Sequence, residues 1–507
     1  MMTKVTSHRS NAPRLLLALL LISPSLVSSV VSAQYDSGAN AERVIDTDAG
    51  VDADPLPMPT VSVRVPDPRP TVTPTTTSLT DPDAASAPDT VIKTIIGLLV
   101  LMTLAYLGAH PTVRALEERL GLSQVIAAGF PFVLLGLVAR HPAIGVLNDR
   151  VLSELGPLLR LGLGWIGFVV GFRFDARLFR NLAPGTGSLV LLSTLLPFSF
   201  VVASCAIVLS LVSQGSESLA QQWPQFVRDA IILGAAAAMT AKTATRLVKS
   251  TESSGIIGRV IRLEELVGVA GLALADSYFR PESESTTWHL PGTAWFLLAV
   301  GLGVTLGVLI YAMLYRAARE QMASAEFLVL SLGSISFAAG IAGYLHLSSV
   351  VVAFVAGALL VNLPGDYHAR LRDTLLRLEH PILLLSLVII GALWRIDDWR
   401  GWLLMPVFVL ARMSGKWFAT SPVLLGREGL HLRLGDRYAL GLAPLGTLAI
   451  AIVINAQLLH PGNSISPMVS AVLGGGVLTE IFVQWFSRRQ GVSSEAHVVP
   501  SPPTGAS

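Results

Sequence analysis

Two adjacent carboxylates, Glu264 and Glu265, lie at the start of the apolar part of "GRVIRLEELVGVAGLALADSYF". Two cations, Arg412 and Lys416, lie within a second apolar stretch, "MPVFVLARMSGKWFATSPVLL". Residues four positions apart share one face of a helix, so these two cations are neighbours. A charge inside a bilayer is costly and usually functional, and a buried cation needs a buried partner. The four side chains therefore predict a charge-paired site within a membrane.

Such a pair has a specific chemistry. Burial disfavours the charged form of both lysine and glutamate, whereas their mutual attraction favours it. A pair balanced in this way can exchange its own contact for a proton on one side and a metal cation on the other, which is the basis of cation:proton antiport. A static structural pair would have the same geometry, so this alternative stays open.

Two further apolar stretches are interrupted near their middle. They read "RDAIILGAAAAMTAKTATRLVKS" and "LGLAPLGTLAIAIVINAQ". Unwound backbone at membrane depth is tolerated where it lines a cavity, and its carbonyl groups can coordinate a cation. The interrupting residues are Thr240, Lys242 and Thr243 in the first stretch, and Pro444, Gly446 and Thr447 in the second. We predict that Thr240 and Thr243 complete an ion site with Glu264 and Glu265.

Lys242 has two possible roles, since it could balance opposed helix ends inside the crossing or extend to the cytoplasmic edge. The simpler alternative for the second interruption is a proline–glycine kink in an ordinary helix.

The composition places the chain in a bilayer. It has 507 residues, of which 52% are hydrophobic and 14% charged, and a soluble domain has about 25% charged residues. Apolar stretches of spanning length begin near residues 91, 121, 152, 188, 228, 256, 292, 325, 347, 381, 401, 437 and 465. We therefore predict an all-α polytopic membrane protein with about 13 transmembrane helices.

The sequence lacks signs of several other classes of protein. Its one cysteine, Cys205, excludes an intrachain disulfide, and no His/Cys cluster has metal-ligand spacing. We expect no resident metal or other cofactor, no nucleic-acid partner and no enzymatic activity.

The ends of the chain differ from its apolar middle. Residues 1–33 have basic residues, an apolar run and small residues at 31–33, which predicts a signal peptide, with an uncleaved first helix as the alternative. Residues 34–90 are rich in Pro, Thr, Ser and Asp and predict a disordered extracytoplasmic tail. The membrane domain would cover 91–487, and a cytoplasmic tail 488–507.

The distribution of basic residues predicts the topology. Loops expected outside, such as "QGSESLAQQWPQF" and "PESESTTWHLPG", contain no Lys or Arg. Loops expected inside are basic, for example Arg173, Arg177 and Arg180, or Arg370, Arg372 and Arg377. The positive-inside rule then places the N-terminus outside and the C-terminus in the cytoplasm. The expected location is a bacterial inner membrane.

A weak internal repeat suggests symmetry. "LSQVIAAGFPFVLLGLVARHP" from Leu122 resembles "LSSVVVAFVAGALLVNLPG" from Leu347. These stretches belong to the second and ninth predicted spans, which cross in opposite directions. The fold would then contain two inverted six-helix repeats with crossed broken helices, as in many transporters. Chance similarity between two Val/Ala/Gly-rich helices is the alternative.

Four stretches in order resemble one family. They are "LGLGWIGFVVGFRFDARLFR", "LSSVVVAFVAGALLVN", "LARMSGKWFAT" and "LGLAPLGTLAIAIVINA". From about Leu120 to Arg488 the chain resembles the monovalent cation:proton antiporter superfamily, that is, the sodium/hydrogen exchanger transmembrane domain. The resemblance implies a homodimer in the lipid bilayer, a core domain that moves to alternate access, and exchange of Na⁺ or K⁺ for H⁺.

The resemblance leaves two alignments of the carboxylates. Family members have an Asp-Asp or Asn-Asp pair at mid-membrane in the helix after the first broken one. Either Glu264 and Glu265 replace that pair, or Glu264 matches an upstream glutamate that forms a salt bridge, here with Arg412. The pair would then be Gly268 and Val269, which bind no ion. That alignment favours a non-transporting sensor or scaffold protein. A transporter of another solute, such as an anion bound by Lys242, is a further alternative.

Overall fold

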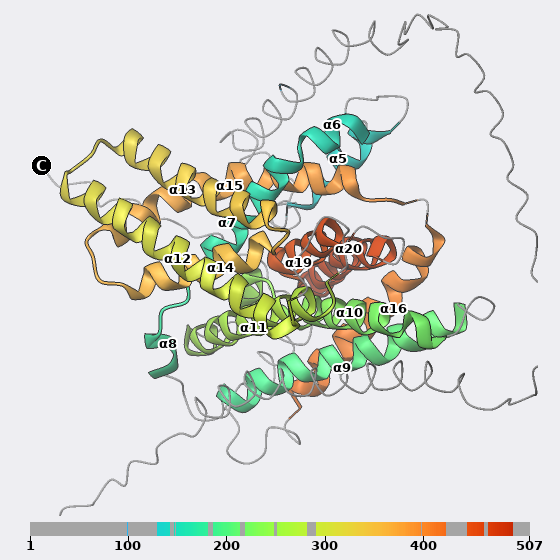
Figure 1. The fold of residues 1–507 in the computed structure, drawn as a ribbon. Coiled ribbons are helices and arrows are strands. Elements are labelled where there is room, and N and C mark those ends of the chain that lie inside the picture. The colour runs from blue at the N-terminus through green and yellow to red at the C-terminus, as the bar shows by residue number, and fades with distance from the viewer. Residues whose placement is uncertain are drawn as a thin grey trace, which may run out of the picture.

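The computed structural model describes residues 99, 129–141, 147, 149–180, 186–212, 219–247, 251–280, 290–396, 398–421, 444–460 and 465–489. The predicted signal peptide, the 34–90 tail and nearly all of the first predicted span lie outside the described residues. So does the C-terminal tail beyond residue 489. In the part of the chain that is described, all regular secondary structure is helical (Figure 1).

The helices follow the order of the predicted spans. They are α5 (Phe130–Arg140), α6 (Asp149–Glu154), α7 (Gly156–Phe172), α8 (Arg177–Arg180), α9 (Thr186–Val212), α10 (Leu219–Ala238), the 3₁₀-helix η2 (Lys242–Leu247), α11 (Thr251–Tyr278), α12 (Gly292–Arg319), α13 (Ser324–Tyr344), α14 (Ser349–Asn362), α15 (Tyr367–Leu393), α16 (Trp399–Ala419), α19 (Thr447–Leu459) and α20 (Ile465–Arg489).

Five of the described helices are long and apolar enough to cross a membrane, namely α9, α12, α13, α15 and α20. Four shorter ones, α5, α7, α14 and α19, are also apolar. The predicted all-α membrane architecture is therefore confirmed. Spans two to thirteen of the prediction correspond in order to described helices.

One helix begins far from its predicted position. The tenth span was expected near residue 381, but α15 begins at Tyr367 and passes through Pro381 without ending. Its first turns contain Arg370, Arg372 and Asp373. Hydropathy marks only the part of a helix that lies in lipid, so a polar extension of the same helix escapes an apolar count.

The helices form two groups that pack mainly within themselves. We call α5, α7, α12, α13, α14 and α15 the α14 group, and α9, α10, α11, α16, α19 and α20 the α19 group. In Figure 1, α13 and α15 lie at one side of the molecule and α9 at the other. The groups meet where α11 packs on α12 and α14, and where α19 packs on α7 and α14.

Glycines hold the α14 group together at very short range. A methyl group on Gly167 or Gly171 of α7 would overlap the carbonyl of Val350 or Phe354 on α14. Small residues let helix backbones approach closely in a membrane, where apolar side chains give no hydrophobic drive to associate. The α7–α14 contact is therefore made by backbone against backbone.

The α5–α15 contact is built in the same way. A methyl group on Gly136 of α5 would overlap the Val388 carbonyl, and one on Gly391 of α15 would overlap the Val133 carbonyl. In α7–α14, residue numbers rise together along the contact. They also rise together over the whole length of α5–α15, from Gly129 beside Leu387 to Arg140, which donates to the Ala392 carbonyl. The two helices of each pair therefore run in the same direction. Two parallel pairs thus form the tightly packed part of the α14 group.

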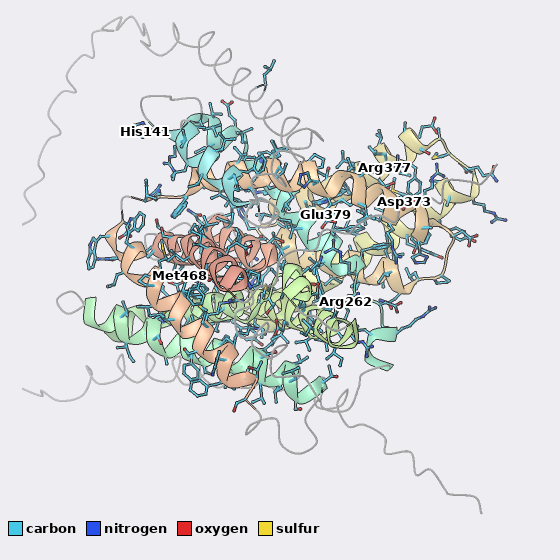
Figure 2. The ribbon with its side chains drawn as sticks, turned by 180° about the vertical axis from the view of Figure 1, so that it is seen from behind. His141, Arg262, Asp373, Arg377, Glu379 and Met468 are labelled. Carbon is cyan, nitrogen blue, oxygen red and sulfur yellow. The ribbon has the colours of Figure 1, made fainter. Side chains whose placement is uncertain are left out.

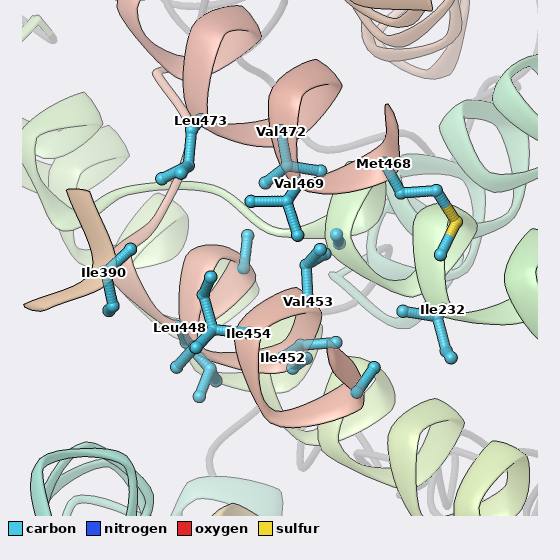
Figure 3. Close-up of a cluster of buried hydrophobic side chains, with 14 of the residues drawn as sticks. Ile232, Ile390, Leu448, Ile452, Val453, Ile454, Met468, Val469, Val472 and Leu473 are labelled. Atoms are coloured by element: carbon cyan, nitrogen blue, oxygen red, sulfur yellow. The ribbon is translucent and has the colours of Figure 1, made fainter. Parts of the chain in front are cut away.

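Branched side chains pack the short helix α19 on all sides. Leu448, Ile452, Val453 and Ile454 of α19 are buried with residues of α20 and α10 (Figure 3). This cluster fixes where α19 begins, and so fixes the unwound segment that precedes it.

We expect Gly171→Ala to lower the stability of the fold, because the added methyl group would overlap the Phe354 carbonyl. Overpacking of this kind costs about 1–3 kcal/mol. The matched control is Gly340→Ala in α13, where nothing lies within 4 Å of the added carbon. Thermal unfolding in detergent should show a lower midpoint only for Gly171→Ala. Equal midpoints would contradict the backbone contact.

Candidate ion site at the crossing of two interrupted helices

The two interrupted stretches meet in space. α10 ends at Ala238, and the chain is not helical again until η2 begins at Lys242. α19 begins at Thr447 after a non-helical segment that contains Pro444 and Gly446. The Ala241 amide donates a hydrogen bond of 2.8 Å to the Pro444 carbonyl. Both interruptions therefore lie at one crossing, which we call the crossing segment (residues 239–241 and 444–446).

Gly446 allows the close approach of the two segments. A carbon added to it would lie 3.3 Å from the Thr240 carbonyl oxygen. Pro444 lacks an amide hydrogen, so no donor at this position is left unpaired. The three interrupting residues of the second stretch thus differ in place: Pro444 and Gly446 belong to the crossing, and Thr447 is the first residue of α19.

Arg412 of α16 holds both halves of the crossing. Its guanidinium donates to the Met239 carbonyl at 2.7 Å, to the Ala237 carbonyl at 3.1 Å and to the Pro444 carbonyl at 3.4 Å. The last carbonyls of a helix lack intrahelical partners and have a partial negative charge. A buried cation satisfies both needs, which explains an arginine that is 0% exposed.

Lys416 connects the crossing to α11. Its Nζ lies 2.7 Å from Glu264 Oε1 and donates to the Ala238 carbonyl, also at 2.7 Å. The two charged side chains are 1% and 0% exposed. The salt bridge to Glu264 is therefore made by Lys416, where one alignment had expected Arg412. The reason is geometric, since the Arg412 guanidinium binds backbone carbonyls of the crossing.

Two buried oxygens near this pair have no hydrogen-bond partner in the described structure. They are Oε2 of Glu264 and Oγ1 of Thr240. Leaving such a group unpaired costs about 1–3 kcal/mol, so an occupant that supplies positive charge or a donor would be stabilised here. Both oxygens are of the type that binds hard cations.

The remaining predicted residues are placed less centrally. Lys242 is exposed in η2, so it does not balance charges within the crossing. The side chain of Thr243 lies outside the described residues.

Gly268 lies where α11 faces the crossing. It is buried, and a methyl group there would overlap the side chain of Met239. Val269 beside it is 3% exposed. One turn along α11 from Glu264, the helix thus presents no oxygen ligand to the unwound backbone.

Glu265 faces the boundary between the two helix groups. The charges that act on it include Arg173 at the end of α7 and Glu379 of α15. Arg173 binds both carboxylate oxygens of Glu379, at 2.6 and 2.8 Å. Glu379 is labelled on the ribbon in Figure 2. This pair could not be predicted from sequence patterns, because Glu379 lies in the polar first half of α15 and Arg173 was interpreted only as a basic residue of a loop.

Comparison with known proteins identifies the family. A family model described as "Sodium/hydrogen exchanger, transmembrane" matches residues 87–488. The chain belongs to this family. The resemblance read from the four sequence stretches is therefore confirmed, and with it an integral membrane protein of a cation/proton exchanger family.

Two solved structures are similar to this sodium/hydrogen exchanger domain. The sodium proton antiporter MjNhaP1 from Methanocaldococcus jannaschii at pH 8 matches with a TM-score of 0.55 and 14% identity, over 79% of this chain and 99% of that one. An electron-microscopy map of the same antiporter gives a TM-score of 0.47 and 16% identity, over 78% and 96%. At such identities the likeness shows the fold alone. No curated protein matches the chain significantly.

Removal of one member of the Lys416–Glu264 pair should destabilise the fold more than removal of both. Lys416→Met leaves a buried carboxylate and Glu264→Gln leaves a buried ammonium, each at a cost of roughly 3–5 kcal/mol. The double variant leaves no charge, so its loss should be well below the sum of the two. Unfolding free energies in mixed micelles would measure this coupling.

The matched control for this cycle is the pair Arg173–Glu379, whose side chains are 28% and 33% exposed. Its coupling should be below about 1 kcal/mol, because water screens both charges. A Lys416–Glu264 coupling as small as that of the control would show that the buried pair does not stabilise the fold.

Proposed function

We propose that the protein is a secondary active transporter that exchanges a monovalent cation, Na⁺ or K⁺, for protons. The observation that supports this most strongly is the buried Lys416–Glu264 pair beside unwound backbone. A buried ion pair stabilises a fold weakly, because desolvation offsets most of its attraction. A buried pair that can exchange its mutual contact for a proton and a cation would have a role in transport, which a static pair would not.

The exchange balances in charge. In the proton-bearing form, Lys416 is an ammonium paired with the Glu264 carboxylate. A cation that enters would bind that carboxylate, with Thr240 Oγ1 and carbonyl oxygens of the crossing segment as further ligands. Lys416 would then release one proton to water and remain as a neutral amine. The reverse steps on the other side of the membrane would complete one exchange.

Glu265 would serve as a second ion- and proton-binding carboxylate. It lies on the boundary between the helix groups, beside the charged pair Arg173–Glu379. From there it could receive a proton or cation on its way to Glu264. Thr243 stays a predicted ligand, and Lys242 would act at the surface.

The wider organisation is also proposed here. The predicted inverted symmetry relates span two (α5) to span nine (α14), and span three (α7) to span ten (α15). It therefore relates one glycine-packed parallel pair, α5–α15, to the other, α14–α7. This pattern supports two inverted repeats. We further propose a homodimer in a bacterial inner membrane, with the N-terminus outside and the C-terminus in the cytoplasm.

One observation favours a second candidate function. Gly268 faces Met239 at the crossing, where the family resemblance would place an ion-binding acid. A non-transporting sensor or scaffold protein on the same fold would have this arrangement.

Proton flux into proteoliposomes, driven by Na⁺ or K⁺ gradients, separates the two functions. We expect flux from the unchanged protein and at least about a tenfold loss in Glu264→Gln, since the carboxylate is the site of exchange. The matched control is Glu320→Gln, which removes an exposed carboxylate after α12 and should leave flux unchanged.

Two outcomes would contradict the proposal in different ways. Full flux in the double change Glu264→Gln/Glu265→Gln would reject the site. A folded protein that gives no flux with Na⁺, K⁺ or Li⁺ would reject antiport and favour the sensor or scaffold function.

A further inference from the structure

A second pair of titratable side chains lies away from the crossing. Asp276 is near the end of α11, and His460 directly follows α19. His460 Nε2 lies 3.4 Å from Asp276 Oδ1. Along α11, twelve positions separate Asp276 from Glu264, which is about 18 Å at the helical rise. The pair is therefore distinct from the candidate ion site.

The polar atoms of this pair are buried, and their contact with each other is longer than a normal hydrogen bond. The side chains of His460 and Asp276 are 2% and 12% exposed. Neither carboxylate oxygen and neither ring nitrogen makes a hydrogen bond in the described structure. Buried polar groups are normally fully hydrogen-bonded, so a single long contact leaves room for a further ligand that both side chains can bind.

The chemistry of the two side chains selects that ligand. Alkali cations prefer oxygen ligands, so an imidazole does not suit them. Transition metals bind imidazole but need three or four ligands, and no group of three His, Cys, Asp or Glu side chains could hold one among the described residues. A proton is the ligand that one carboxylate and one imidazole can share. Histidine exchanges a proton near neutral pH.

The pair lies at the boundary of the two helix groups. Ser348, the N-cap of α14, lies beside Asp276. Arg280, just after α11, donates to the Leu345 carbonyl at 2.9 Å and stacks 3.6 Å from the Trp295 ring of α12. This end of α11 is thus attached to the α14 group by polar contacts.

Few other charges act on the pair. His460 and Arg280 are the charged groups that act most strongly on Asp276. α14 and α19 have no titratable side chain within their bounds, and the first half of α12 has none. On other packed elements, α7 has Arg160 near its start, α20 has Glu480 in its second half, and Arg228 of α10 binds the adjacent Asp229. His460 and Asp276 therefore face each other with few other charged side chains on the packed elements.

We propose that Asp276 and His460 form a second proton-binding site, which holds this end of α11 and α19 against α14. With the proton bound, the imidazolium neutralises the carboxylate and the boundary stays closed. When the proton leaves His460 for water, the Asp276 carboxylate loses its counterion and must be hydrated, so the boundary opens. The inference rests on the proposed function only in that this opening would control access to the transport site.

Thiol labelling tests the opening directly. The reporter is Val351→Cys in the first turn of α14, at a position 2% exposed in the same buried cluster as Leu272 and Ala273 of α11. The background is Cys205→Ala, and Tyr344→Cys, at an 83% exposed position, corrects for the reagent's own pH dependence. We expect the ratio of labelling rates, reporter to reference, to rise at least about fivefold from about pH 5.5 to pH 8.

Two further variants show whether the pH dependence of labelling comes from Asp276 and His460 or from the transport site. Asp276→Asn/His460→Gln keeps two side chains that can hydrogen-bond but cannot titrate here, so its ratio should be low at every pH. Glu264→Gln/Lys416→Met should keep the pH-dependent ratio even with transport abolished, which separates failure of this proposal from failure of antiport. A flat ratio in the unchanged pair, or an unaltered pH dependence in Asp276→Asn/His460→Gln, would overturn the proposal.

Discussion

The fold depends on how buried cations satisfy the end of α10. Lys416 binds the Ala238 carbonyl and Glu264, and Arg412 binds the neighbouring carbonyls of Ala237 and Met239. A helix that stops inside a bilayer exposes carbonyls to a medium without water. Both cations come from one face of α16, so a single helix satisfies the interruption. Without these bonds, the carbonyl groups at the end of α10 would be buried and unpaired.

The same bonds determine which oxygen atoms of the candidate site remain free to bind an ion. Each donor that binds a carbonyl removes one possible ligand from an incoming ion, so the oxygens left over decide what can bind. Those are Glu264 Oε2 and Thr240 Oγ1, which are buried and unpaired. The unpaired side-chain atoms of the candidate site are consequently oxygens. The site is also next to a lysine whose charge must be displaced or neutralised before a second cation is stable.

Much of this could be predicted from the sequence, because it rests on local patterns. The spacing of Arg412 and Lys416 placed both cations on one face, and the residues around Thr240 and Pro444 marked both interruptions. The partner of Glu264 could not be predicted, since the choice between two cations one turn apart depends on how α16 packs. Asp276 is near a helix end, where a carboxylate is ordinarily solvated. In the structure, His460, which is remote in sequence, lies over it.

The glycine contacts of the α14 group also determine where the molecule can deform. Where a backbone carbonyl faces a glycine, as at Gly167 or Gly391, there is no room for even one added methyl group between the helices. Packing through side chains is more compliant, because rotamers can adjust. The boundary with α11 and α19 is packed in this second way, around Leu272 and Ile452. Sliding at this boundary should therefore meet less steric resistance than relative movement of the glycine-packed helices.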